Sequence, residues 1–435
     1  MLLSKPSLIF CFAFCTPYLL VAADTSVRRV DERRAAQVGI RRVDGRHLRL
    51  YTDLPHGDAV DGLGNVFDAA VDQWTEYFGI APQRTAHWHM QGFLMEDRAK
   101  FAALGLLPET NLDFVNGYCQ DRELWLAEQP SDYYRRHLLL HEGTHGFMYA
   151  FLGERAPGWY MEGMAELLGT HRWRNGRLAL RQLPADRDDV PMWGRIKLVQ
   201  ESKAIHLPAV LTLGEGRALS TDEYAWCWAL CKFLDSHPRL SDQFHRLSKR
   251  LDGQDFNKQF RETYRQQWAE LSFEWQAFIA ALDYGYDTER MTVTNRRASL
   301  VEADAEITIA ADRGWRSTGW RLQAGKTYTV TAAGRYVIAR DEIVGDDIPG
   351  DSEPWPCEPG GVTLEYHDGL PLGMLLGLLR PIDDHKPADF SKPLAVGLQA
   401  SVTTKVDAIL YLRVNDWPAR LSDNEGTLRA SIVPQ

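Results

Sequence analysis

Apolar and polar residues alternate along the first part of the chain in a way that predicts mixed α/β structure. His47 to Thr52 alternate with the period of two that marks a strand, and Val66 to Phe78 has apolar residues at helical spacing. Residues 28–46 before them are charged and are expected to form a loose lead-in. The further elements expected are a strand at 86–94, a helix at 97–104, and a hairpin of 114–119 and 123–127.

Helices are expected after residue 130, and from residue 191 to about residue 283 the pattern is helical throughout. Ser131 is placed to cap a long helix that ends at Gly153, and Gly158 begins a second helix that runs to about Gly169. Residues 191–283 continue the pattern, and Ser220-Thr221-Asp222-Glu223 is a capping box ahead of an apolar stripe. These helices follow the α/β segment without a linker of low complexity.

The pattern changes near residue 290, where short alternating runs broken by Gly, Asp and Pro begin and continue to the C-terminus. Such runs are typical of an antiparallel β-sandwich. We therefore expect an α+β domain followed by an antiparallel β-sandwich domain. The expected divisions are a signal peptide at 1–23, an N-terminal α/β part at 24–130, a helical part at 131–288, and a sandwich at 295–435.

The N-terminus has the features of an export signal. Lys5 precedes an apolar stretch, and Val21-Ala22-Ala23 fits small-residue cleavage before Asp24. An uncleaved N-terminal anchor is the alternative, although the apolar stretch is short for a stable membrane span. No later segment is apolar enough to cross a bilayer. The mature protein is therefore expected outside the cytoplasm, in the periplasm or the extracellular space, with no membrane span.

Composition excludes some partners and a disulfide framework. A net charge of −10 over 435 residues argues against nucleic acid, which requires a basic face. Two of the six cysteines lie in the expected signal peptide. Cys227 and Cys231 lie four apart on an expected helix, a spacing poorly suited to a disulfide between them. Buried free thiols are expected instead.

The segment His141-Glu142-Gly143-Thr144-His145 carries the chemistry of a metal site. Residues four apart share a helix face, so both imidazoles can reach one ion. Glu142 lies beside them, where it can take a proton from water activated by the metal. Zinc suits such a set because it binds both imidazole nitrogen and carboxylate oxygen. On its own this motif is only suggestive.

A second motif follows twelve residues after His145, in Pro157-Gly158-Trp159-Tyr160-Met161-Glu162-Gly163-Met164-Ala165-Glu166. With it the sequence resembles the gluzincin zinc metallopeptidases, over roughly residues 85–235, and within them the peptidase MA-like bacterial group. The resemblance implies a thermolysin-like α+β fold in which Glu162 is the third metal ligand. It also implies that Glu166 accepts a ring N–H of a ligand histidine, and that residues 123–128 form an edge strand that pairs with an extended substrate.

Other residues near these motifs have two interpretations each. His137, one turn before His141, is either a ligand in an alternative register or a supporting residue, since Glu162 completes the site without it. Gluzincins often use a Tyr or His some sixty residues after the third ligand to stabilise the oxyanion. Tyr224 fits that spacing, although it could instead be a core aromatic. His206 is the weaker candidate.

The C-terminal part resembles the LecA-like calcium-dependent galactophilic lectins. Ser317-Thr318-Gly319, Tyr366-His367-Asp368 and the tail from Tyr411 to Gly426 carry the likeness. Asp416, Asp423 and Asn424 offer hard oxygen ligands of the kind that calcium prefers, so a Ca²⁺ site and a carbohydrate partner are implied. The alternative is an ordinary sandwich loop, because turns also favour Asp and Asn.

Together these motifs predict an exported zinc metallopeptidase, a hydrolase that acts on a peptide or protein substrate. His141, His145 and Glu162 would hold Zn²⁺, Glu142 would act as the general base, and Tyr224 would stabilise the oxyanion. The C-terminal domain would direct the enzyme to glycans or glycoproteins. The alternative function is a carbohydrate- or surface-binding protein whose metallopeptidase domain is degenerate.

Overall fold

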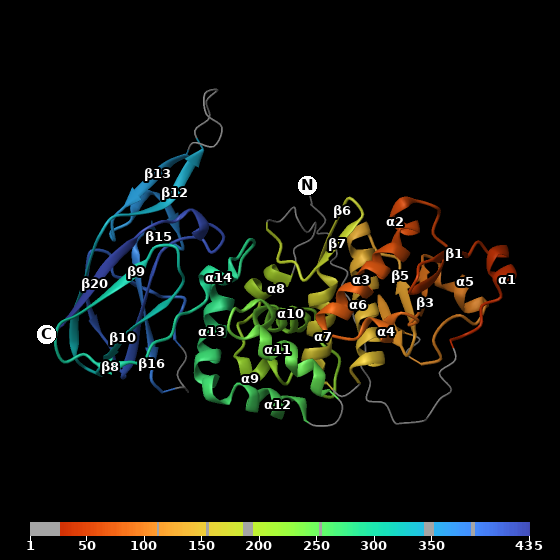
Figure 1. Cartoon of the computed structure of the whole chain (residues 1–435), viewed down its shortest axis with the longest axis horizontal. Helices are drawn as coiled ribbons and strands as arrows, with labels where there is room; N and C mark the ends of the chain where they lie inside the picture. The colour runs from red at the N-terminus through yellow and green to blue at the C-terminus, as the bar shows by residue number, and fades with distance from the viewer. Residues whose placement is uncertain are drawn as a thin grey trace, which may run out of the picture. The chain divides into compact units, whose positions relative to one another are not determined.

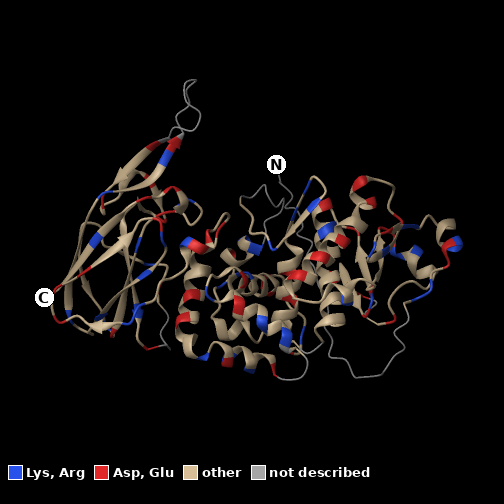
Figure 2. Cartoon of the chain, viewed as in Figure 1, with Lys and Arg blue, Asp and Glu red and all other residues tan. Residues whose placement is uncertain are grey.

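The structure is a computed structural model, and it describes residues 27–110, 113–153, 156–185, 195–251, 255–342, 352–383 and 388–435. The signal peptide expected at residues 1–23 lies outside the described residues. The chain divides into two compact units: the first comprises the chain up to Asp235 together with Leu240–Thr263, and the second comprises Ser236–Arg239 together with Tyr264–Gln435. Acidic and basic residues are interspersed along the elements of both units (Figure 2).

The first unit begins with a five-stranded sheet, of which β1, β3 and β5 are labelled in Figure 1. Its strand order is β1-β2-β3-β5-β4. Strands β2, β3 and β5 are parallel to one another, and β1 and β4 pair antiparallel at the two ends. Every residue of β3 is buried, as expected of a central strand covered on both faces. The strands are β1 (Arg41–Asp44), β2 (Leu48–Thr52), β3 (Met90–Met95), β4 (Gly117–Gln120) and β5 (Glu123–Ala127).

Aromatic side chains fill the space on both faces of this sheet. On one face Trp74 of helix α3 packs on Phe147 of helix α6, with ring centroids 5.6 Å apart. On the other face Phe93 stacks on Trp125 at 5.9 Å, and Trp125 in turn on Tyr118. The helices of this part are α1 (Glu32–Gln37), α2 (Asp58–Asp61), α3 (Leu63–Tyr77), α4 (Pro82–Thr85) and α5 (Arg98–Ala103).

The charged segment 28–46 is ordered, which corrects the expectation of a loose lead-in. Asp31 caps α1 by accepting hydrogen bonds from the backbone N–H groups of the next turn. Strand β1 then pairs with β2 over four residues at the sheet edge. Its arginines are neutralised locally, since Arg42 pairs with both Glu32 and Asp44. Charged side chains are compatible with an edge strand, where one side of the strand faces solvent.

Helices form the rest of the first unit, and a short hairpin that was not expected interrupts them. The hairpin joins β6 and β7 through Asn175 and Gly176, both with positive φ. Asn-Gly is the residue pair that a two-residue hairpin turn prefers. The elements are α6 (Asp132–Phe151), α7 (Gly158–Gly169), β6 (His171–Arg174), β7 (Arg177–Leu180), α8 (Arg195–Glu201), α9 (Leu207–Val210), α10 (Thr221–Ser236), α11 (Ser241–Leu247), η1 (Ser248–Arg250) and α12 (Phe256–Thr263).

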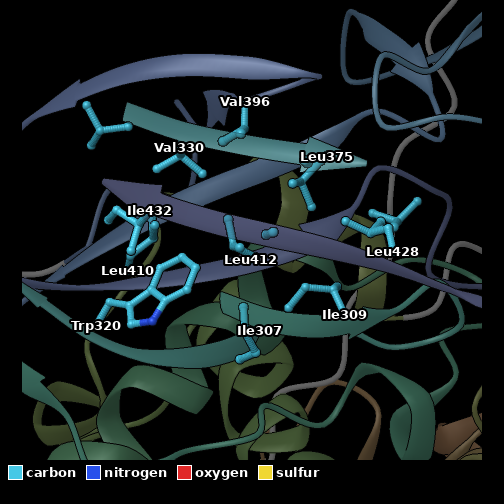
Figure 3. Close-up of a cluster of buried hydrophobic side chains, with 14 of the residues drawn as sticks. Ile307, Ile309, Trp320, Val330, Leu375, Val396, Leu410, Leu412, Leu428 and Ile432 are labelled. Atoms are coloured by element: carbon cyan, nitrogen blue, oxygen red, sulfur yellow. The ribbon is translucent and has the colours of Figure 1, made fainter. Parts of the chain in front are cut away.

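In the second unit two sheets enclose one apolar core (Figure 3). The five-stranded sheet has the order β17-β16-β19-β10-β8, and the four-stranded sheet has the order β18-β11-β20-β9. Leu410 and Leu412 from the first sheet meet Val330 and Ile432 from the second inside this core. The main strands are β9 (Ala305–Ala310), β10 (Arg316–Leu322), β11 (Thr327–Ala333), β16 (Leu375–Pro381), β18 (Gln399–Thr403), β19 (Ala408–Val414) and β20 (Thr427–Pro434).

Two hairpins and short edge strands complete the β part of this unit. Strand β12 pairs with β13, and β14 with β15, both antiparallel. A 3₁₀ turn, η3, precedes the last strand. The bounds are β8 (Ser299–Leu300), β12 (Tyr336–Glu342), β13 (Ser352–Cys357), β14 (Val362–His367), β15 (Leu370–Leu372), β17 (Leu394–Ala395) and η3 (Leu421–Asp423).

The second unit also contains helical elements, η2 (Arg265–Gln267), α13 (Trp268–Ala281) and α14 (Thr288–Met291). Phe273 of α13 packs on Tyr411 of β19 with ring centroids 4.7 Å apart, in a core cluster that includes Trp315. Helix α13 therefore covers the outer face of the five-stranded sheet. This differs from the expected division, in which the helical metal-binding part extended to residue 288.

Cys227, Cys231 and Cys357 are buried free thiols and Cys119 is a partly exposed one, so the expectation of free thiols is confirmed for the described residues. Burial raises the pKa of Cys227 and Cys231 well above that of an ordinary thiol, which keeps both protonated and unreactive. Among the residues that the structure describes, no helix has the length and apolar character needed to cross a bilayer.

Candidate metal centre

Helix α6 carries the first two donor residues through the middle of the first unit. Its N-terminus is capped by the Ser131 hydroxyl, which accepts a hydrogen bond from the Tyr134 backbone N–H at 3.2 Å, as the sequence predicted. Every residue from His137 to Met148 is buried. The helix therefore brings His141, Glu142 and His145 into the interior, where polar groups must find partners.

Helix α7 brings Glu162 against the two histidines. The Nε2 atoms of His141 and His145 lie 3.3 Å apart, and Glu162 Oε2 lies 3.3 Å from the first and 3.2 Å from the second. Zinc bonds of 2.0–2.1 Å in a tetrahedron place neighbouring donor atoms about 3.3 Å apart. The three donors thus form one face of a tetrahedron of the size that zinc requires, and the residues fit the metal.

Charge supports the same fit. Burial disfavours both ionised forms, but the carboxylate and the imidazoles stabilise each other. His145 and His141 lower the pKa of Glu162 to about 2, whereas Glu162 and Glu166 raise the pKa of His141 to about 10. The two buried carboxylates thus stabilise a positive charge at His141. The same negative field would stabilise a metal cation held between the carboxylate and the imidazoles.

Glu166, one turn after Glu162, lies on the other side of His141. Its Oε1 is 3.3 Å from His141 Nδ1, an ion-pair distance at which the ring N–H makes no regular hydrogen bond. Its Oε2 is 3.4 Å from His137 Nε2. Arg195 donates to both oxygens, from Nε at 2.7 Å and from Nη2 at 2.5 Å. Against the effect of burial, Arg195 and then His137 and His141 hold the pKa of Glu166 well below its usual range.

The sequence predicted that Glu166 lies beside a ligand histidine, but it did not predict the contact with Arg195. Arg195 begins α8, about 30 residues after the carboxylate that it binds, and the sequence places no motif around it. An isolated arginine on a helix gives no signal of its partner, because the pairing depends on how α8 packs in the folded chain.

Glu142 lies against the end of the sheet. Its carboxylate is so close to Gly117 of β4 that a Cβ at that position would come 2.3 Å from Glu142 Oε1. Only glycine fits there without displacing Glu142. Burial raises the pKa of Glu142 above that of an ordinary glutamate, against the opposing effect of His141 and His145. A carboxylate with a raised pKa is a stronger base, and a general base is most effective when its pKa lies near the working pH.

The edge strand of the sheet is β4, which corrects the expected position of the edge. Residues 123–128 were expected to pair with substrate, but β5 (Glu123–Ala127) lies between β3 and β4. The hairpin forms at the predicted residues, but its first strand and not its second is the outer one. In the sheet β4 is the outermost strand, and it is also the one that carries Gly117 beside Glu142.

Tyr224, in the first turn of α10, approaches the metal centre. Its ring centroid is 6.3 Å from that of His141, and its side chain is only 1% exposed. Helix α10 comes close because Gly163 of α7 lets the Cys227 carbonyl approach, so that an added Cβ would meet that oxygen at 2.6 Å. His206, the weaker candidate, is exposed and directly precedes α9.

In the second unit the three residues expected to bind calcium also come together. The Asp416 carboxylate accepts hydrogen bonds from Asn424 Nδ2 at 2.7 Å and from the Trp417 backbone N–H at 2.6 Å. The side-chain oxygens Asp423 Oδ1 and Asn424 Oδ1 are buried without a hydrogen-bond partner in the described structure. Burial raises the pKa of Asp416 to about 6. The candidate calcium residues thus offer two buried oxygens without a hydrogen-bond partner among the described residues and one buried carboxylate, and oxygen donors of this kind are the ligands that Ca²⁺ prefers.

Comparisons with known proteins give only distant structural similarity. No protein-family model matches the sequence, and the curated proteins contain no match. Among solved structures, a domain described as "EclA N-terminal domain; PllA-like lectin" is 18% identical, with 30% of this chain and 95% of that chain covered and a TM-score of 0.21. The Aeromonas hydrophila PliG, a periplasmic inhibitor of g-type lysozyme, is 12% identical, with coverage of 33% and 97% and a TM-score of 0.16. Similarities at this level carry no inference about activity.

Proposed function

We propose that this chain is a zinc-dependent metallopeptidase of gluzincin type, exported from the cytoplasm. His141, His145 and Glu162 hold the metal in this proposal. The observation that supports it most is the spacing of the three donor atoms, 3.2 to 3.3 Å, which matches the edge of a zinc tetrahedron of about 3.3 Å. The chemistry of the donor set, two imidazoles and a carboxylate, is that of a catalytic zinc site with one open position.

The reaction follows from the residues around the centre. Zinc, when bound, supplies a Lewis acid that polarises the scissile carbonyl and makes water acidic. Glu142 receives the proton of the attacking water and delivers it to the departing amine, a role that its raised pKa favours. Tyr224 is the residue proposed to donate to the oxygen that becomes negative, since its ring centroid lies 6.3 Å from that of His141.

The substrate in this proposal is an extended peptide that adds to the edge of the sheet at β4. Backbone hydrogen bonds to an edge strand fix a peptide independently of its side chains, which suits a hydrolase acting on protein. Gly117 supports this placement because it lies both on β4 and against Glu142. The scissile bond of a peptide held there would lie next to the general base.

The experiment that tests the proposed function is digestion of a peptide library by the purified mature chain, with zinc content measured on the same sample. Hydrolysis that stops with a chelator and returns with zinc is expected. Stoichiometric zinc without hydrolysis of any peptide would favour the alternative, a carbohydrate- or surface-binding protein with a degenerate peptidase domain.

Glu166 is expected to support zinc binding without being a ligand. Glu166→Ala should weaken zinc affinity by about 10–100-fold, because His141 then loses the carboxylate behind its Nδ1. Competition with a chelator of known affinity measures this change. Glu201→Ala, at an exposed position of α8, is the matched control and should leave the affinity unchanged. Complete loss of zinc in Glu166→Ala would instead make Glu166 a ligand.

A second role, as a calcium-dependent module, is proposed for the second unit on the strength of the unpartnered Asp423 and Asn424 oxygens. Millimolar calcium is expected to raise the melting temperature of the full chain by roughly 2–4 °C. Asp423→Ala should remove this shift and any glycan binding, and should leave peptide hydrolysis intact. Asp304→Ala, at an exposed position of the same unit, should keep the shift. No shift in the unaltered chain would leave an ordinary sandwich loop.

A further inference from the structure

Two groups of residues that could each hold a metal ion overlap in the first unit. One is His141, His145 and Glu162, and the other is His137, His141 and Glu166, with all the residues of both groups buried. They share His141, whose Nε2 faces Glu162 and whose Nδ1 faces Glu166. Both groups consist of two imidazoles and one carboxylate, so residue type alone does not decide which of them takes a metal ion.

Arg195 distinguishes the two groups. Its Nε and Nη2 atoms donate to the two oxygens of Glu166 at 2.7 and 2.5 Å. A bidentate guanidinium occupies the syn lone pair of each oxygen, which is also the one that a metal ion prefers, so an ion would be left with the weaker anti lone pairs. Because Glu166 is fully buried, its interaction with Arg195 is little screened by water. The same positive charge also repels a second cation from the His137 side.

We propose that Arg195 keeps Glu166 out of the coordination of the metal and thereby fixes the ion in the group of His141, His145 and Glu162. Arg195 is a positioning residue, since its nearest link to the ion runs through Glu166 and the His141 ring. Glu142 lies on the side of α6 that faces β4, beside Gly117. It can act as a base only if the ion is held where its water is within reach of that carboxylate. This inference rests on the proposed function, in that a metal ion occupies the centre.

The test is a double-mutant cycle on zinc affinity in the full chain, made from Arg195→Met and His137→Gln. In the unaltered background His137→Gln is expected to change the zinc dissociation constant by no more than about twofold. In the Arg195→Met background the freed Glu166 recruits His137, and His137→Gln is then expected to weaken zinc binding by roughly tenfold, as for residues that share one site. Equal effects of His137→Gln in the two backgrounds would overturn the proposal.

Cobalt substitution gives a second readout that does not depend on catalysis. The visible absorption of bound Co²⁺ reports its ligands, so His137→Gln should leave the spectrum unchanged when Arg195 is present and alter it when Arg195 is replaced. The triple variant that adds Glu166→Gln is the matched control. It removes the carboxylate that the ion would move to, and the coupling between positions 137 and 195 should disappear.

Arg195→Met leaves the Glu166 charge buried without its counter-ion, which can prevent folding. Arg195→Lys is the second variant for the case in which Arg195→Met does not fold. Lysine keeps the positive charge, but it contacts the Glu166 carboxylate at one point only and leaves one oxygen free. The coupling between Arg195→Lys and His137→Gln in zinc affinity should be smaller but of the same sign. Absence of this coupling would overturn the proposal. Zinc binding without hydrolysis would overturn the proposed function alone, whereas an unaltered chain that binds no zinc would overturn both.

Discussion

Glu142→Gln is expected to lower peptide hydrolysis by about 10²–10⁴-fold while the chain keeps its zinc. The glutamine amide has nearly the volume of the carboxylate, so it fits the space beside Gly117 without disturbing the helix. It cannot accept a proton, and the reaction loses its base. The three donors at Nε2 of His141, Nε2 of His145 and Oε2 of Glu162 are untouched, so metal content should stay at the unaltered level.

The measurement is the rate of cleavage of a chosen peptide, with zinc determined on the same preparation by atomic absorption. Glu128→Gln is a suitable control, since that glutamate lies next to β5, where it pairs with Arg135, and makes no contact with the donors. Activity above a few per cent of the unaltered rate in Glu142→Gln would contradict the role of Glu142.

Replacement of a donor should have a larger effect on the metal itself. His145→Ala and Glu162→Ala each leave two protein donors, too few for stable zinc binding, so both zinc and hydrolysis should be lost. Zinc content after dialysis and the melting temperature of the metal-free chain should be measured together, to separate metal loss from unfolding. If a donor variant unfolds at the same temperature as the metal-free form of the unaltered chain, the substitution has removed only the ion and has not disturbed the fold.

His87→Ala is the matched control for these variants, because His87 is an exposed histidine of the same unit. It should bind zinc as the unaltered chain does. Retention of zinc at full stoichiometry in Glu162→Ala would contradict the ligand assignment and would direct attention to His137 and Glu166, the overlapping group.

Local signals in the sequence predicted the helices of the site well. The Ser131 cap, the end near Gly153 and the helix at residues 158–169 all have counterparts in α6 and α7. Half of the capping box at Ser220 is present: the Ser220 backbone N–H donates to Glu223 Oε2 at 2.8 Å, whereas the Ser220 hydroxyl donates to Asp222 Oδ1 at 2.6 Å. Such features depend on contacts within one turn, and the residues that make them are adjacent in the sequence.

The order of strands and the membership of α13 could not be predicted in the same way. Residues 117–120 and 123–127 both read as strands, and nothing local tells which of them is outermost. Likewise Phe273 and Ala277 give α13 an apolar face, but periodicity does not say which core that face joins. The Asn175-Gly176 turn is different, because its signal is local and lies in the sequence itself.

The division of the chain bears on which fragments of the protein can fold alone. The backbone passes between the units after residues 235, 239 and 263, and the short segment Ser236–Arg239 belongs to the second unit. There His237 Nε2 lies 2.6 Å from the buried carboxylate of Glu274 on α13. The second unit is therefore built from two separate stretches of chain. A fragment that begins at Tyr264 would lack His237 and would leave the buried Glu274 without that partner.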